Sequence, residues 1–269
     1  MQGLLDDLRF GLRLLTRSPG FAAVAILSLA LGIGANTAIF TLADAVFFRP
    51  IPVEKPEELL HVATVDASME MSLGTLSRDN LADIRRDASH LEAIEASVPI
   101  RIALQLPTGD EPILVEAVTD GYFGMLGIEA GKGRMIDARD SGGRHVVLAD
   151  HLWRDRFEAD PGIVGRTLRI SGVEFTVAGV APASFVGLNF PMAPQAWVHV
   201  DQTHQLEATM AMMFSRRGLT HFSTARLAEG STLADAQAEL AQISVDLAQR
   251  YPEANRGRSF EASSATMGR

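Results

Sequence analysis

Cysteine is absent from the 269 residues. A chain without cysteine has no disulfide framework, no thiol nucleophile and no cysteine-based zinc or iron–sulfur site. Aromatic residues are also few, at 6%, and the two tryptophans, Trp153 and Trp197, are interpreted as core or interface residues. Hydrophobic residues nevertheless make up 47% of the chain, which is enough apolar surface to bury a core and excludes a disordered protein.

Basic residues are the scarcer charge, with 24 Lys and Arg against 33 Asp and Glu. The deficit lies beyond residue 49, where 20 basic residues face 30 acidic ones, a net charge of −10. Phosphate backbones are bound by clustered Lys and Arg, so the sequence excludes a nucleic-acid partner.

Catalytic motifs are also lacking. The chain has no G-x-S-x-G and no H-E-x-x-H. Gly131-Lys132 is not a phosphate loop, because Leu126 replaces the first glycine and Gly133 replaces the Ser or Thr; a turn is predicted instead. No ATP site, catalytic residue or cofactor-binding residue is therefore predicted, and the chain is interpreted as not an enzyme.

Candidate metal ligands and acid–base residues are scattered. The histidines are predicted to be surface or packed residues because none has ligand spacing: His61, His90, His145, His151, His199, His204 and His221. Four aspartates of the middle region are predicted to be loop and helix-cap residues: Asp137, Asp140, Asp150 and Asp155. No metal site is predicted.

One long hydrophobic run is present. The 26 residues Ser18–Ala43 carry no charge, and a bilayer core needs roughly 20 apolar residues in a helix. This run predicts a transmembrane helix over residues 18–48. Basic residues precede it at Arg9, Arg13 and Arg17, so the positive-inside rule places the N-terminus in the cytoplasm.

Two other interpretations of this run compete with a membrane helix. Ala43-Asp44-Ala45 has the shape of a signal-peptide cleavage site, but a signal peptide has a much shorter apolar region. A buried helix of a soluble protein rarely runs this long without a charged face.

Small residues recur along the predicted membrane helix. Ala30, Gly34 and Ala38 are four residues apart, and Asn36 lies beside them. Such a stripe favours close packing against another membrane helix, although small residues are also simply common in such helices. Residues 1–17 have leucines at helical spacing and are predicted to form a cytoplasmic amphipathic segment on the membrane lipid surface.

Residues 49–269 are predicted to form one α+β domain. Hydrophobic alternation and turn residues predict strands at 59–65, 101–106, 113–118, 145–148, 167–170, 174–180, 196–200 and 221–227. Helices are predicted at 77–87, 120–126, 150–157 and 232–250, the last with Leu233, Ala236, Leu240, Ile243 and Leu247 on its apolar face. Proline, methionine and polar residues interrupt the pattern over Gly187–Met213, which predicts a subdomain insertion.

Four stretches, in order, carry a family resemblance: Leu8–Pro52; Glu116–Arg134 with its Tyr122-Phe123 pair; Val146–Leu188 with Asp160-Pro161 and Gly165-Arg166; and Ala225–Pro252. With them the chain resembles the MacB-like ABC transporter permeases of the FtsX/MacB superfamily, specifically their periplasmic core domain and its preceding membrane helix. The resemblance covers nearly the whole chain.

The resemblance implies a place in the bacterial inner membrane and a role in export or lipoprotein extraction. It implies a separate ATPase subunit, transmission of motion through membrane helices, and a dimer with a second permease copy. A periplasmic adaptor, a lipoprotein and an outer-membrane channel are further partners that it implies. Such permeases continue into at least three more membrane helices; no second apolar run of that length occurs here, so a truncated permease is expected.

Two alternative functions stay open. A single-pass anchor could present a periplasmic binding or scaffold module that works without an ATPase. A membrane-tethered hydrolase would instead require a cleft with convergent titratable groups.

Overall fold

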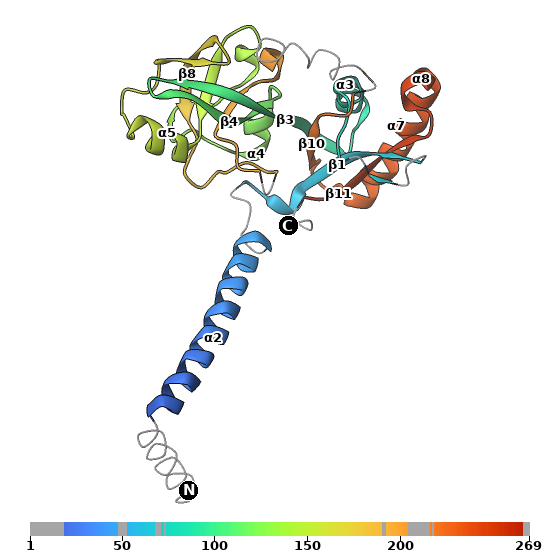
Figure 1. Ribbon diagram of the computed structural model, residues 1–269. Coiled ribbons are helices and arrows are strands. Elements are labelled where there is room, and N and C mark those ends of the chain that lie inside the picture. Colours follow the sequence, from blue (N-terminus) through green and yellow to red (C-terminus); the bar gives the residue numbers. More distant parts are fainter. Residues whose placement is uncertain are drawn as a thin grey trace, which may run out of the picture. The chain divides into compact units, whose positions relative to one another are not determined.

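The computed structural model describes residues 19–47, 53–67, 71–72, 74–189, 192–203, 216 and 218–265. The chain divides into two units: one contains helix α2 (Pro19–Phe47), and the other contains every other described element (Figure 1). The predicted cytoplasmic segment, residues 1–17, lies outside the described residues. The predicted boundaries at 17/18 and 48/49 stay predictions.

Helix α2 is the described part of the predicted membrane segment. Its large apolar side chains are exposed, with Leu31 at 79% and Phe40 at 78%. Within the described residues, no helix reaches the length and apolarity needed to cross a membrane. Residues 18 and 48, and the side chains of α2 residues 21, 39 and 42–47, lie outside the described part of the chain. The transmembrane helix therefore stays a prediction.

The second unit has two lobes, and the first is covered by helices. Its strands are β1 (Leu59–Asp66), β2 (Met71–Ser72), β10 (Phe222–Leu227), β11 (Arg258–Ser264) and the first half of β3 (Leu91–Leu106), and its helices are α3 (Arg78–Asp87), α7 (Leu233–Arg250) and α8 (Pro252–Asn255). The helices and the sheet share one apolar core, which includes Val62, Ile84, Ile94, Leu240 and Phe260.

The second lobe is a closed barrel. Its strands are the second half of β3, β4 (Gly109–Val118), β6 (His145–Leu148), β7 (Thr167–Ile170), β8 (Val173–Val180) and β9 (Ala196–His199). The pairings run β3-β4-β9-β6-β8-β7 and return from β7 to β3. Alternate residues fill the interior, as period-two strands require, and α5 (Asp150–Phe157) adds Leu152 and Trp153. Short elements complete this unit: η1 (Pro56–Glu58), α4 (Tyr122–Leu126), β5 (Lys132–Gly133), η2 (Ala138–Asp140) and η3 (Val200–Gln202).

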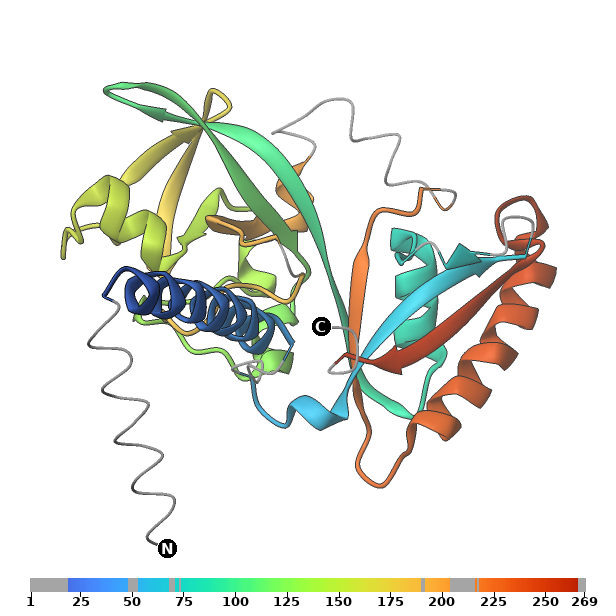
Figure 2. The ribbon, with the colours of Figure 1, turned by 60° about the horizontal axis from the view of Figure 1, so that its bottom comes forward.

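Strand β3 joins the lobes, as Figure 2 shows. It pairs with β10 over Leu91–Ser97 and with β7 at Leu104 and Gln105, and with β4 along its other edge. The sequence predicted its second half and missed the first. Pro99 has no N–H to donate, but it lies in the stretch between the β10 and β7 pairings. The carbonyl of Ala96 points to the β4 side of β3, because it accepts a hydrogen bond from the amide of Thr119. Backbone groups alternate in direction along an antiparallel strand, so the nitrogen of Pro99 points away from β4, towards the gap between β10 and β7.

Gly179 lies at an irregularity in β8. The pairing between β6 and β8 shifts there by one residue, and a Cβ on Gly179 would lie 2.3 Å from the carbonyl oxygen of Arg134. Gly179 therefore stands at a bulge where two backbone segments approach closely. Tyr122 and Phe123 are each 1% exposed and anchor the short helix α4 in the core.

Several sequence predictions need correction. Asp150 does not cap α5; Ala149 is the N-cap, and Asp150 is the first helical residue. Leu233 is not on the buried face of α7, since it is 40% exposed in the first helical turn. Lys132-Gly133 is strand β5 and not part of a turn, because it pairs with Val180 and Gly179.

Strand β11 was missed entirely, and it forms the edge of the sheet beside β1. Of the predicted insertion over residues 187–213, the stretches 190–191 and 204–213 lie outside the described residues. Strand β9, within that range, is central in the sheet, between β4 and β6. The predicted α+β class is confirmed, since the core domain mixes helices with a largely antiparallel sheet that also contains parallel pairs.

Candidate functional site

The start of β1 and the end of β11 lie side by side, and we call this pair of strand ends the base of the core domain. The two strands are antiparallel, with Leu60 opposite Ser264, and the amide of Ala265 donates to the carbonyl of Leu59 at 3.0 Å. The chain therefore enters and leaves its sheet at one point. Force applied to either end reaches the sheet along two adjacent hydrogen-bonded strands.

Arg226 binds the segment that leads into β1. This β10 side chain is 6% exposed, and its Nη2 donates to the carbonyl of Glu54 at 2.7 Å. Its Nη1 donates to the carbonyl of Lys55 at 3.3 Å and to Oε2 of Glu58 at 3.1 Å. The same guanidinium donates to the carbonyl of Met125 in α4 at 2.8 and 3.1 Å. One buried cation thus holds the incoming segment, the central sheet and α4 together.

The incoming segment is tightly packed. Gly127, which ends α4 in the left-handed conformation (φ 67°), lies under Glu54, whose Cγ would be 2.4 Å from an added Cβ. Lys55 has φ 42°, an uncommon conformation for a residue with a side chain, and its ammonium pairs with Glu58 at 3.0 Å. A cavity of about 200 Å³ adjoins Glu54, Lys55, Glu58 and Glu92. The backbone here is constrained by several contacts at once.

A buried carboxyl group lies in the barrel lobe. Glu116 of β4 is 0% exposed and accepts hydrogen bonds from Nδ2 of Asn189 at 2.8 Å and Nε1 of Trp197 at 3.0 Å. Burial raises the pKa of Glu116 above its ordinary value, and the hydrogen bonds from Asn189, Trp197 and Ser97 oppose the shift. This group fixes the loop at Asn189 to the sheet.

The residues predicted for membrane-helix packing share α2. Ala30, Gly34, Asn36 and Ala38 are all exposed, and a Cβ built on Gly34 would meet no described atom within 4 Å beyond its chain neighbours and the backbone of its own helix. Their role in helix packing stays a prediction.

The scattered histidines do not converge. His145 contacts Asp140 at 2.7 Å, His199 contacts Asp120 at 2.6 Å, and His90 contacts Ser231 at 2.9 Å. Burial, together with the charge of Arg78, lowers the pKa of His221 to about 4. His61 is half-buried, His151 is exposed, and His204 lies outside the described residues. In the part of the chain that the structure describes, no three His, Asp or Glu side chains are placed to hold a metal ion.

Two of the four singled-out aspartates do lie together. Asp137 and Asp140 form a capping box around η2, and Asp140 also receives a two-pronged ion pair from Arg134 at 2.7 Å. Asp150 pairs with Arg154, and Asp155 is exposed. Reasoning from sequence missed Arg226 and Glu116. Nothing in a strand sequence distinguishes a buried, fully bonded ionic residue from a solvated one.

Comparisons with known proteins agree on the fold. The periplasmic region of MacB from Actinobacillus actinomycetemcomitans has a TM-score of 0.56 at 11% identity, over 79% of this chain and 90% of that chain. The extracellular domain of the noncanonic ABC-type transporter YknZ from Gram-positive bacteria has a TM-score of 0.55 at 10% identity, over 76% and 99%. A permease-protein domain from Porphyromonas gingivalis has a TM-score of 0.56 at 14% identity, over 80% and 92%.

A search among proteins of curated function gives no match in sequence. The family comparison is decisive, because residues 22–243 match the MacB-like periplasmic core domain, which is most of the chain. The chain belongs to this family and carries the periplasmic core domain of a MacB-like ABC transporter permease.

Proposed function

We propose that this chain is the membrane-anchored periplasmic part of a MacB-like permease, and that it contributes to ATP-driven export or envelope substrate handling. ATP is hydrolysed by a separate nucleotide-binding subunit, and this chain transmits motion without catalysing a reaction. The observation that carries the proposal is the pairing of the start of β1 with the end of β11, together with the hold of Arg226 on the segment that leads into β1. A domain attached to a moving membrane part through one such point moves as a unit.

In this proposal α2 anchors the domain in the bacterial inner membrane, with the N-terminus in the cytoplasm and the core domain in the periplasm. The uncharged run Ser18–Ala43 and the basic residues before it support this orientation. The exposed apolar side chains of α2 are suited to contact with lipid.

The small-residue stripe of α2 is proposed to pack against other permease helices or against a second permease copy. Ala30, Gly34 and Ala38 lie within about one third of the helix circumference, so a partner helix could approach closely. Asn36 lies about 160° around the helix from Gly34, on another face, and is not part of this proposed contact.

Affinity purification of the tagged chain from detergent-solubilised membranes tests the proposal. An ABC-type ATPase and other permease helices should co-purify with it. The variant Ala30→Leu/Gly34→Leu/Ala38→Leu should lose these proteins, whereas Ala25→Leu, about 140° away around the helix, should keep them. Recovery of the chain without any ATPase, from cells that express the partner genes, would contradict the transport role and favour a binding module.

A further inference from the structure

One arginine of the first lobe contacts two helical elements that are distant from it in the sequence. Arg216 lies ahead of β10, and its Nη1 donates to Oδ2 of Asp83 at 2.6 Å and to Oδ1 of Asn80 at 2.9 Å, both in α3. Its Nε lies 3.6 Å from Oδ2 of Asp79. The guanidinium carbon lies 3.7 Å from the ring centre of Tyr251, between α7 and α8. The guanidinium group is therefore held at its edge by oxygen acceptors and at its face by an aromatic ring.

Other side chains hold these acceptors in place. Asn80 and Asn255 are 0% and 1% exposed, and their side-chain amides exchange two hydrogen bonds at 2.9 and 3.2 Å. Asp83 is 4% exposed, and its Oδ1 also pairs with Nη2 of Arg86 at 2.8 Å. The acceptors thus have fixed positions that do not depend on Arg216 alone. A planar group with donors along its edge matches them better than a compact ammonium group does.

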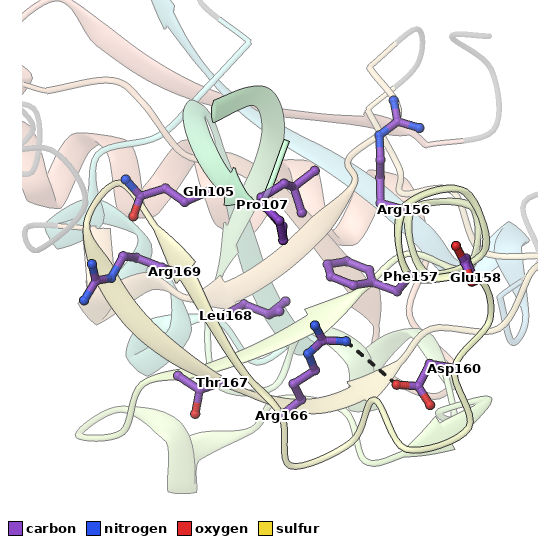
Figure 3. A pocket seen from close by; sticks show the side chains of 11 residues that line it. Gln105, Pro107, Arg156, Phe157, Glu158, Asp160, Arg166, Thr167, Leu168 and Arg169 are labelled. Carbon is purple, nitrogen blue, oxygen red and sulfur yellow. Dashed lines mark ion pairs between the residues drawn. The ribbon is translucent and has the colours of Figure 1, made fainter. Parts of the chain in front are cut away.

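A groove of about 680 Å³ beside α5 and β7 shows how different an exposed arginine is (Figure 3). Three of its lining residues are arginines that pair with nearby carboxylates and are 43–58% exposed: Arg156, Arg166 and Arg169. Exposed ion pairs of this kind contribute little to stability. Arg216 is 19% exposed and contacts two buried polar side chains. Its surroundings are those of a bound group and not of a surface ion pair.

The segment that follows Arg216 is bound to the start of α3. The amides of Thr220 and His221 donate to the carbonyl of Leu76 at 3.2 and 3.1 Å, and the amide of Leu76 donates to the carbonyl of His221 at 2.8 Å. Leu76 directly precedes Ser77, the N-cap of α3. Arg216 contacts the same helix through its side chain, so the chain is held to α3 at two points before β10 begins.

We propose that Asn80, Asp83 and Tyr251 form an internal guanidinium-binding site, and that Arg216, its ligand from the same chain, is a latch that keeps residues 218–221 on α3. An emptied site keeps one cation beside Asp83, because Arg86 stays in place. The emptied site therefore stays formed and accepts another guanidinium group. This inference goes beyond the proposed function and does not depend on an ATPase.

Hydrogen exchange, measured by mass spectrometry on the full chain in nanodiscs, tests the proposal. Arg216→Ala empties the site, and Arg216→Lys keeps the charge without the planar group. The matched control is Arg86→Gln, which removes the other ion pair of Asp83 within α3. The probes are methylguanidinium chloride and methylammonium chloride at equal millimolar concentration, far below the molar range in which guanidinium salts unfold proteins.

In Arg216→Ala, exchange in residues 218–221 should quicken at least about tenfold, which corresponds to roughly 1.4 kcal/mol in the free energy of local opening. Arg216→Lys should also exchange faster than the parent, whereas Arg86→Gln should stay within about twofold of it. Methylguanidinium should slow the exchange of Arg216→Ala towards that of the parent, and methylammonium should not.

Parent-like exchange in Arg216→Ala would overturn the proposal, and so would equal slowing by the two cations or slowing by neither. Circular dichroism reports whether each variant is folded. If Arg216→Ala does not fold, Arg216→Lys decides the question, and parent-like exchange in that variant would show that the site does not require a guanidinium group.

Discussion

At the residue scale, two buried ionisable side chains, Arg226 and Glu116, hold neighbouring segments to the sheet of the core domain. Each is satisfied by several partners, so the free energy of each group depends on keeping all of them in place. Removing such a group leaves buried partners without hydrogen bonds, which costs more than losing an exposed ion pair.

Substituting Arg226→Gln should lower the free energy of unfolding by about 2–3 kcal/mol, because the carbonyls of Glu54 and Met125 lose their donors. Denaturant unfolding measures this loss, and hydrogen exchange should quicken in residues 53–58. The exposed control Arg101→Gln should change stability by less than about 0.5 kcal/mol. Unchanged exchange in residues 53–58 would show that Arg226 does not hold the incoming segment.

Glu116 predicts a pH dependence. Since burial raises its pKa in the folded state above 4.5, the folded protein retains this proton where the unfolded chain has lost it. The stability that the protonated group contributes is complete below pH 4.5 and is lost as the pH rises through the folded-state pKa. Glu116→Gln does not titrate, so the stability advantage of the parent over this variant should shrink with rising pH.

Urea unfolding of the parent and Glu116→Gln between pH 4.5 and 8 measures that difference. Glu129→Gln, which removes one exposed negative charge, corrects for net charge. An advantage that grows with pH would mean that Glu116 is more easily ionised in the folded protein.

At the element scale, the edge strand β11 is closed by side chains of α7. The amide of Phe260 donates to Oγ of Ser244 at 2.8 Å, and the amide of Ala262 donates to Oε1 of Gln237 at 2.7 Å. Gln237 also donates to the carbonyl of Phe260 at 3.3 Å. These contacts occupy backbone groups that an edge strand would otherwise offer to another chain.

Ser244→Ala/Gln237→Ala should therefore quicken hydrogen exchange at the amides of Phe260 and Ala262 and cost about 1–3 kcal/mol of stability. The amides of β11 that face β1 should keep their protection. Gln242→Ala serves as control, because Gln242 is an exposed α7 residue that contacts Asp246. Equal exchange in the double variant and the parent would show that these side chains do not close the edge.

Strong local signals made some elements predictable. The helix at Leu233–Arg250 has the capping box of Thr232 and Asp235 and a helical apolar period. Strand β11 and the first half of β3 were missed because their pairing partners, and not their own sequences, specify them. A gap between the β10 and β7 pairings accommodates Pro99 in β3. Side chains of α7 bind the free backbone groups of β11.

At the scale of the whole molecule, the resemblance predicted the family, and periodicity could not predict the barrel. Its closure joins Leu104 to Ile170, a contact between distant parts of the chain that leaves no local pattern. The base of the domain was unpredictable for the same reason, since it joins Leu60 to Ser264.

The central claim, a core domain held outside the inner membrane by α2, is tested most directly by cysteine labelling, since the chain has no cysteine of its own. Gln249→Cys, on the exposed face of α7, and Gln2→Cys are each expressed in cells whose outer membrane has been permeabilised. An impermeant maleimide should label Gln249→Cys in intact cells and Gln2→Cys only after lysis, and both proteins should sediment with membranes until detergent is added. Labelling of Gln249→Cys only after lysis, or recovery in the aqueous fraction without detergent, would contradict the account.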